Sequence, residues 1–122
     1  MRELTSHKVN GLNDVLKIEV LDEPGAGGAN HAYAIVPTVG NASGVRIDFQ
    51  KGPLQETGNV PNGLSQEALL AIVEDRLKCF QAGPYACREN AIALTHVQDA
   101  MHWLHHRTRE RIARGVEGTS NK

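Results

Sequence analysis

The chain has 122 residues, 13 lysines and arginines against 14 aspartates and glutamates, and 40% hydrophobic residues. This length favours one compact domain over residues 1–122, and the composition is typical of a globular chain and excludes disorder as the default. Because the charges nearly balance, no whole-molecule field draws the chain to DNA or to an anionic membrane. The sequence has neither an apolar run long enough to span a bilayer nor a signal-peptide core at its start, so we expect a cytoplasmic protein.

The first part of the chain predicts a small antiparallel β-sheet. Residues 16–20 and 45–50 alternate apolar and polar side chains, and residues 31–36 form a short apolar run. A strand follows the glycines at 25–28, so we interpret them as a hairpin connection and not as a phosphate-binding loop. Residues 51–63 carry five glycines and prolines and predict an irregular linker, which ends the β-rich part of the domain at residue 63.

The second part of the chain, residues 64–122, predicts an antiparallel helical hairpin. The first helix begins after Ser65, a favourable N-cap residue, and ends at Gly83. The second helix runs from about 85 to 113 without glycine or proline, roughly 29 residues or about 43 Å. The apolar stripe expected along the first helix is Leu69, Val73, Leu77 and Phe80. The fold class is therefore α+β, with the sheet first and the hairpin second.

The second helix carries an apolar seam with alternating steps of four and three residues, as in a coiled coil. The seam residues are Asn90, Leu94, Val97, Met101, Leu104 and Thr108. One shorter helix cannot cover so long a seam, so we expect the hairpin to oligomerise through its helices. An asparagine in such a seam typically fixes register and oligomeric state. The alternative for Asn90 is a ligand contact, because an amide both donates and accepts hydrogen bonds.

Four arginines crowd the end of the second helix, more than the helix dipole alone explains: Arg107, Arg109, Arg111 and Arg114. Arg107 and Arg111 continue the face of Asn90, where guanidinium groups suit phosphate. Asn90 and Arg107 are about 25 Å apart along one helix, so a small nucleotide cannot touch both in one protomer. It can do so if an antiparallel second chain brings its own Arg107 beside Asn90 of the first.

Other residues with chemical potential have simpler interpretations. His102, His105 and His106 lie on the long helix, but no glutamate completes a zinc motif, so we expect a solvated face and no metal or cofactor. The H-x-T element that starts at His106 is half of a two-histidine phosphodiesterase signature, which leaves catalysis a minority interpretation. Cys79 and Cys87 flank the predicted turn and are interpreted as small buried thiols.

A specific combination of motifs then points to known relatives. It comprises Gly52-Pro53, the run 69–104 with FQxG, CREN and WL, and the ending RGVEGT at 114–119. About half of the chain resembles the helical hairpin shared by two phage families, Thoeris anti-defense protein one and anti-CBASS protein two. The strands and the GP linker before the hairpin are similar to the Thoeris branch.

The resemblance implies a sponge, a non-enzymatic protein that sequesters a signal. Its ligand would be glycocyclic ADP-ribose, bound without cleavage in the cytoplasm of an infected bacterial host. The family's aromatic and amide contacts match Phe80 and Asn90, and its phosphate-facing arginines match Arg107 and Arg111. The resemblance also implies that the pocket lies between protomers of a homodimer, and that such dimers assemble into a homohexamer.

The ending of the chain implies a second site by the same resemblance. Arg114, Gly115, Gly118 and Thr119 match the motif with which relatives bind cyclic di- or trinucleotides of CBASS. The alternative is a helix C-cap with Gly115 at C′. Three alternatives stay open for the whole chain: a sponge mainly for CBASS cyclic oligonucleotides, a signal-degrading phosphodiesterase, and a DNA-binding regulator.

Overall fold

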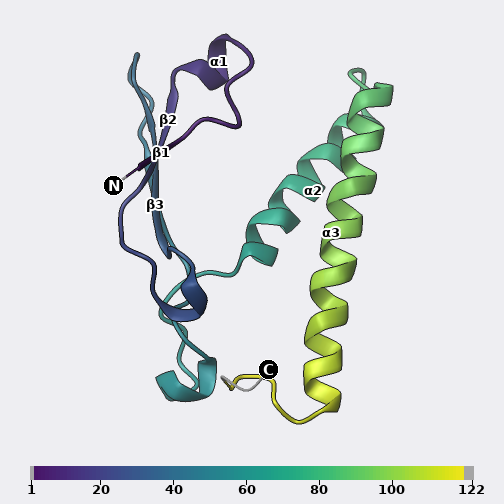
Figure 1. The fold of residues 1–122 in the computed structure, drawn as a ribbon. Coiled ribbons are helices and arrows are strands. Elements are labelled where there is room, and N and C mark those ends of the chain that lie inside the picture. The colour runs from purple at the N-terminus through teal and green to yellow at the C-terminus, as the bar shows by residue number, and fades with distance from the viewer. Residues whose placement is uncertain (1, 120–122) are drawn as a thin grey trace. The chain divides into compact units, whose positions relative to one another are not determined.

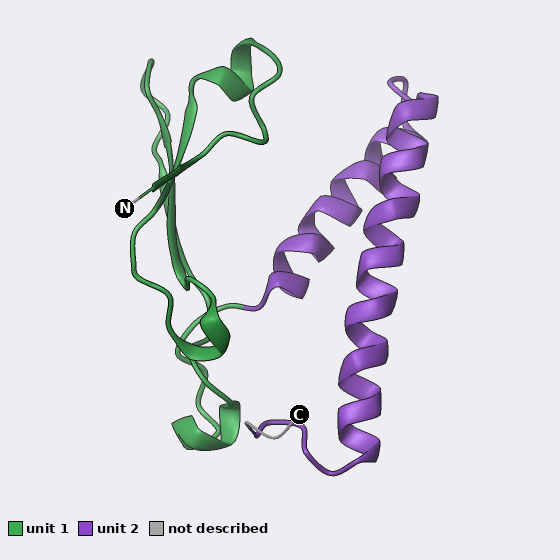
Figure 2. Ribbon diagram, in the orientation of Figure 1, with its two compact units in different colours: residues 1–64 green, residues 65–122 purple. Residues whose placement is uncertain are grey.

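The computed structural model describes residues 2–119 and divides the chain into two compact units, Met1–Leu64 and Ser65–Lys122 (Figures 1 and 2). The division falls one residue from the predicted end of the β-rich part. The last three residues of the predicted hairpin part, 120–122, lie outside the described residues. The expectation that residues 1–122 form one domain stays a prediction.

The first unit contains a four-stranded antiparallel sheet in chain order (Figure 1). Its strands are β1 (Arg2–Leu4), β2 (Leu16–Val20), β3 (Ala32–Pro37) and β4 (Val45–Asp48). The three predicted strands are confirmed within two residues at their ends. Sequence analysis missed β1, because three residues are too few to show an alternating pattern. A one-turn helix, α1 (Gly11–Asp14), lies between β1 and β2 and is capped by the Asn10 side chain.

The core of the sheet unit is small and lies where β2 meets β3. Val20 and Ala32 are almost fully buried, at 1% and 2% exposure. The connection between these strands contains the short 3-10 turn η1 (Ala26–Gly28), where Gly27 and Gly28 both have a positive φ. A strand follows this turn, so the glycine-rich segment is a hairpin connection, as predicted.

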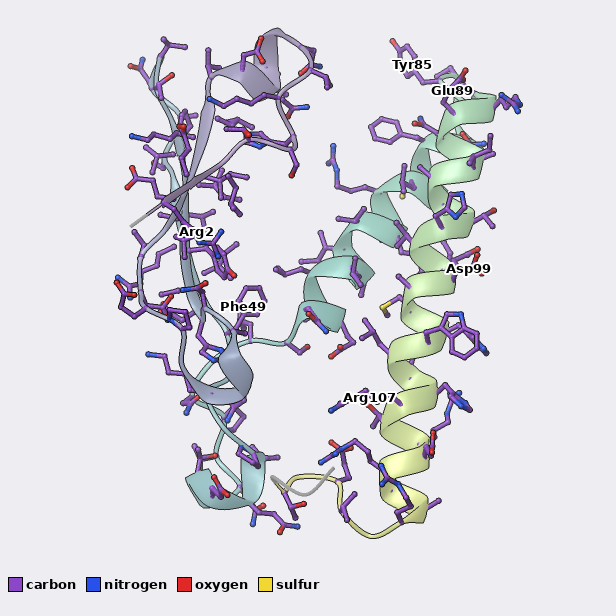
Figure 3. The ribbon with its side chains drawn as sticks, viewed as in Figure 1. Arg2, Phe49, Tyr85, Glu89, Asp99 and Arg107 are labelled. Atoms are coloured by element: carbon purple, nitrogen blue, oxygen red, sulfur yellow. The ribbon has the colours of Figure 1, made fainter. Side chains whose placement is uncertain are left out.

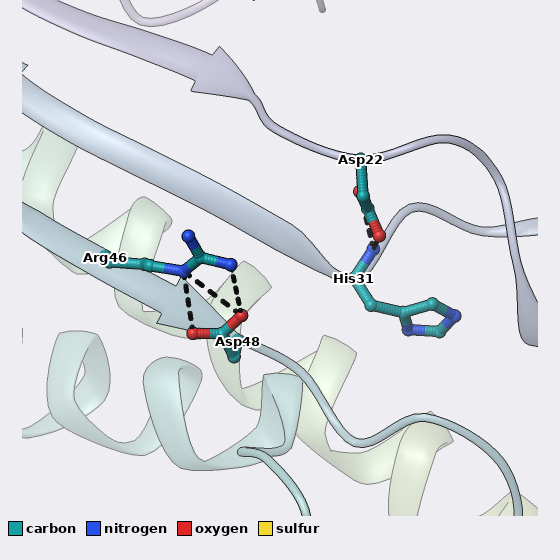
Figure 4. A network of polar contacts seen from close by, with 4 residues as sticks. All are labelled: Asp22, His31, Arg46 and Asp48. Carbon is teal, nitrogen blue, oxygen red and sulfur yellow. Dashed lines mark hydrogen bonds and ion pairs between the residues drawn. The ribbon is translucent and has the colours of Figure 1, made fainter.

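Polar contacts close the same connection (Figure 4). The Asp22 carboxylate accepts from the backbone N–H of His31 at 2.9 Å, and this hydrogen bond lowers the pKa of Asp22. Beside it, Arg46 and Asp48 form a fork-shaped ion pair, with Nε to Oδ2 at 3.0 Å and Nη2 to Oδ1 at 3.2 Å. The pair lowers the pKa of Asp48 and raises that of Arg46.

The predicted irregular linker is more ordered than expected. It contains a 3-10 turn, η2 (Leu54–Thr57), and is tied back to the end of the sheet. The Asn62 side chain accepts from the backbone N–H of Lys51 at 2.8 Å and donates to the Lys51 carbonyl at 3.0 Å. At Gly63, a Cβ would lie 2.4 Å from the carbonyl carbon of Phe49, so this close approach requires glycine. The linker is thus a closed loop of the first unit.

The second unit is a hairpin of two helices, α2 (Gln66–Ala82) and α3 (Arg88–Ala113). The Ser65 hydroxyl accepts from the Ala68 N–H at 3.1 Å, which confirms the predicted cap of α2. The prediction that the second helix begins near residue 85 is wrong by three residues. Cys87 has an extended backbone and caps α3 through its thiol, while the Gln81 side chain accepts from the Cys87 N–H at 3.1 Å. The turn therefore uses residues that sequence analysis assigned to the helix.

The predicted seam of α3 is confirmed, because each of its members is partly buried and the residues beside them are exposed. On α2, the partly buried residues include Leu70, Glu74, Leu77 and Gln81. The predicted stripe of α2 is thus partly wrong, since Val73 and Phe80 are 44% and 40% exposed. A single partner helix covers only one face of α2, which leaves the adjacent face open. Within residues 2–119, no helix is long and apolar enough to cross a membrane.

Candidate functional site

The open face of α2 is the first part of the candidate site. It consists of the partly buried Leu69 and the exposed Val73, Arg76 and Phe80, which follow one another at steps of four, three and four residues. This spacing places the four side chains on one face of the helix, and we call this face the α2 stripe. Apolar groups exposed in a row on a helix are typical of an interaction surface.

An apolar groove continues the stripe toward the middle of α3. Its lining includes Leu69 and Val73 of the stripe, together with Trp103 and Leu104 of α3. Trp103 is 65% exposed and makes edge-to-face contacts with His102 and His106, at ring centroid distances of 5.3 and 5.7 Å. Grooves with this lining accept apolar side chains or flat ring systems.

Phe80 lies in the last turn of α2, next to the hairpin turn. Its ring is accessible, and the guanidinium carbon of Arg76 lies 5.5 Å from the ring centroid. This is the distance of a cation–π contact. An accessible aromatic ring suits the stacking of a base, as the resemblance implied for this residue. Sequence analysis did not select Arg76, although its position one helical turn before Phe80 was a sufficient signal.

Asn90 lies in the first turn of α3, so the hairpin brings it to the same end of the unit as Phe80. Its side chain is partly buried, and its backbone N–H donates to the Cys87 thiol at 3.4 Å. The local structure therefore fixes the position of Asn90 at the start of the seam. Both interpretations of Asn90, register and ligand contact, remain open.

Arg107 lies near the other end of α3, whereas Tyr85 and Glu89 mark the hairpin turn (Figure 3). Because α3 is continuous from Arg88 to Ala113, Asn90 and Arg107 are about 25 Å apart in one chain. Arg107 is exposed, and no described residue forms a hydrogen bond or ion pair with it. The hairpin thus brings Phe80 and Asn90 to one end and leaves Arg107 at the other.

Arg111 occupies an environment that sequence analysis did not anticipate. Its exposure is 7%, and its Nη2 atom donates to the carbonyls of Val116 and Thr119, both at 2.9 Å. Its Nε atom also pairs with the Glu117 carboxylate at 3.3 Å. The guanidinium group therefore holds the loop of residues 116–119 against α3. That Arg111 faces a phosphate stays a prediction, and binding would have to accommodate these contacts.

The end of α3 forms the C-cap that the sequence offered as the alternative for this segment. Gly115 has a φ of 73°, its N–H donates to the Ile112 carbonyl at 3.0 Å, and the Val116 N–H donates to the Arg111 carbonyl at 3.0 Å. These two bonds define a Schellman motif with Gly115 at C′. Gly118 also has a positive φ, at 79°, and the next N–H, that of Thr119, donates to the Val116 carbonyl. The RGVEGT ending is therefore a compact loop, and its role as a second site stays a prediction.

The remaining candidate residues, the cysteines and histidines, give less support to a functional site. The interpretation of the two cysteines as buried thiols is wrong, because Cys79 and Cys87 are both exposed. Cys79 projects from α2 on a side that α3 does not cover, and Cys87 lies in the turn. His106 lies 3.8 Å from the Glu110 carboxylate. Among residues 2–119, no group of three or more histidines, cysteines or acidic residues is placed to hold a metal ion.

Two comparisons with known proteins agree with this geometry. The family model described as "Acb2/Tad1, hairpin domain" matches residues 41–109 of the chain. Thoeris anti-defense 1 from Bacillus phage SBSphiJ7 is 49% identical over 76 residues, which are 62% of this chain and 52% of that protein. The matched region thus spans about half the length of this relative. Since the family model covers more than half of the chain, including α2 and most of α3, the chain belongs to the Acb2/Tad1 hairpin-domain family.

Proposed function

We propose that the chain is a phage anti-defense sponge, which binds glycocyclic ADP-ribose of Thoeris immunity and releases it unchanged. The family membership and the printed name of the phage relative support an anti-defense role. The resemblance of Phe80, Asn90, Arg107 and Arg111 to the family's contacts supports the ligand. An aromatic ring, an amide and guanidinium groups are the partners that a base, a ribose and a pyrophosphate require.

The observation that carries the proposal is the distance between the two ends of α3. Phe80 and Asn90 lie at the hairpin turn, and Arg107 lies about 25 Å away along an unbroken helix. One small ligand reaches all three only where two chains meet. We therefore propose an antiparallel homodimer with two equivalent pockets, each built from the turn end of one chain and Arg107 of the other.

The packing of the hairpin supports the same assembly. Apart from Arg111, no described residue of α2 or α3 is buried. Two helices without a closed core gain too little from burial to be stable alone. A second chain laid along the α2 stripe and the seam of α3 would supply the missing burial. Further association of such dimers into a homohexamer is part of the proposal.

The RGVEGT loop supports a second, separate ligand class. Glycines at 115 and 118 carry no side chain that would keep a phosphate away from the backbone, and Arg114 adds a cation beside them. Such a loop suits phosphate groups. We propose that cyclic di- or trinucleotides of CBASS bind there, and sequestering them is the alternative main role of the chain.

One experiment separates a sponge from an enzyme. The purified protein is incubated with glycocyclic ADP-ribose, the mixture is heated to denature the protein, and the released nucleotide is identified by mass spectrometry. Recovery of the intact signal supports sequestration, and conversion to a linear product would contradict it. The phosphodiesterase alternative requires that His106→Ala abolish turnover, and the DNA-binding alternative requires salt-sensitive retention of duplex DNA.

A further inference from the structure

Arg76 occupies a special place in the α2 stripe. It lies between Val73 and Phe80, its side chain is exposed, and its guanidinium carbon is 5.5 Å from the Phe80 ring centroid. A guanidinium group presents five N–H donors in a planar fork. Any group that lies against the Phe80 ring is therefore within reach of this guanidinium group.

The helix that carries Arg76 offers it no counter-ion. Charged side chains on a helix pair at three or four residues' distance. At these distances from Arg76 stand Ile72, Val73, Cys79 and Phe80, none of them acidic. The nearby Lys78, by contrast, pairs with Glu74 at 3.8 Å. Within residues 2–119, no hydrogen bond or ion pair involves the Arg76 guanidinium group.

The position of Arg76 becomes costly when the hairpin assembles. A second chain that covers the apolar stripe also removes water from the cation between Val73 and Phe80. An isolated charge loses much free energy in such a place unless an anion compensates it. A nucleotide with a pyrophosphate group supplies that anion, and the guanidinium fork matches two phosphate oxygens.

We infer that Arg76 is a further ligand-binding residue, which pairs with the phosphates of a nucleotide whose base lies on Phe80. The inference rests on the proposed function, because it assumes a nucleotide in this pocket.

The test compares three variants with the wild-type protein by calorimetric titration with glycocyclic ADP-ribose at rising salt concentration. Arg76→Gln keeps a polar side chain but removes the charge, Arg76→Lys keeps the charge but removes the fork, and Lys78→Gln is the control on the same helix. We expect Arg76→Gln to bind at least tenfold more weakly and with a shallower salt dependence, since one screened ion pair is lost. Arg76→Lys should lie between the two, and Lys78→Gln should match the wild type.

The outcomes distinguish this inference from the proposed function. A wild-type protein that does not bind the signal would overturn both. A wild-type protein that binds, together with Arg76→Gln of equal affinity and salt dependence, would overturn the role of Arg76 alone. Gel filtration monitors assembly. If Arg76→Gln no longer assembles, Arg76→Lys is the deciding variant. Weaker binding by an Arg76→Lys protein that still assembles supports the phosphate contact, and unchanged binding refutes it.

Discussion

The two units of the chain differ in whether they contain a buried apolar core. In the sheet unit, Val20 and Ala32 form a buried core, and the Asp22 and Asn62 side chains satisfy backbone groups of the connections. In the hairpin unit, the described parts of α2 and α3 contain no buried apolar residue. A long helix in that unit instead exposes a tryptophan at 65%. The first unit has a small buried apolar core, whereas the two helices of the second unit have none.

Under the proposed function, assembly and ligand binding both depend on the hairpin unit. An open apolar face on a short hairpin is unstable alone, so the surface that needs a second chain also builds the proposed pocket. Changes to the hairpin should therefore affect assembly, ligand binding or both. Changes to the sheet should affect only local stability.

The largest effect is expected from a charge in the α2 stripe. Val73→Glu places a carboxylate where a second chain should pack, so the oligomer should dissociate and the helical signal in circular dichroism should fall. Val45→Glu is the matched control, because Val45 of β4 is similarly exposed, at 53% against 44%. Gel filtration should separate the two variants. An oligomer that survives Val73→Glu unchanged would remove the stripe from the interface.

A second variant separates binding from assembly within the hairpin. Phe80→Leu keeps an apolar side chain in the stripe but loses the flat ring on which a base stacks. We expect glycocyclic ADP-ribose to bind at least tenfold more weakly, about 1.4 kcal/mol, with the oligomer retained. Calorimetry beside gel filtration measures both properties. Equal affinity of variant and wild type would exclude Phe80 as a base contact.

Arg111 is the exception within the hairpin unit, because its contacts close part of that unit internally. Arg111→Met should release the RGVEGT loop, at a cost of about 1 kcal/mol, since water can reach the freed carbonyls. Hydrogen exchange at the amides of residues 115–119 should accelerate about fivefold at this cost. Arg109→Met, an exposed neighbour, is the control. Unchanged exchange in Arg111→Met would mean that the C-cap alone holds the loop.

The smallest effect is a pH dependence confined to the sheet unit. Hydrogen bonding from the His31 N–H lowers the pKa of Asp22 below that of an unfolded aspartate. The carboxylate therefore stabilises the sheet above the unfolded pKa, and this contribution is lost as the pH falls through the folded pKa. Asp22→Asn should flatten the acid side of the stability curve in urea titrations. A wild-type curve and a variant curve of the same shape would contradict this origin.

Most of the fold was predictable from sequence because its patterns are strong. The steps of four and three residues in α3 correctly identified the covered face, and Ser65 and Gly83 correctly marked the ends of α2. The short strand β1 carries no periodicity, so pattern analysis could not find it. The predicted apolar face of α2 was right at Leu77 but one residue off at Val73 and Phe80, because periodicity alone does not say which of two adjacent faces the partner helix covers.

The candidate site was predictable only in outline. The distance between Asn90 and Arg107 follows from sequence numbers and helix geometry, so it could be stated in advance. The burial of Arg111 could not, because it depends on the loop after the helix turning back toward α3. Cys87 likewise gave no sign that its thiol caps α3, since cysteine is not a favoured N-cap residue.

The pocket shared between two chains is the central claim, and complementation between two defective chains tests it most directly. An Asn90→Ala chain and an Arg107→Ala chain are tagged differently, mixed, and purified as heterodimers for titration with glycocyclic ADP-ribose. In an antiparallel dimer, one pocket keeps both native residues and the other carries both substitutions. The heterodimer should bind with wild-type affinity at about half the wild-type capacity, although each homodimer is impaired at both pockets. Heterodimers that bind no better than the two homodimers would show that Asn90 and Arg107 do not meet across two chains.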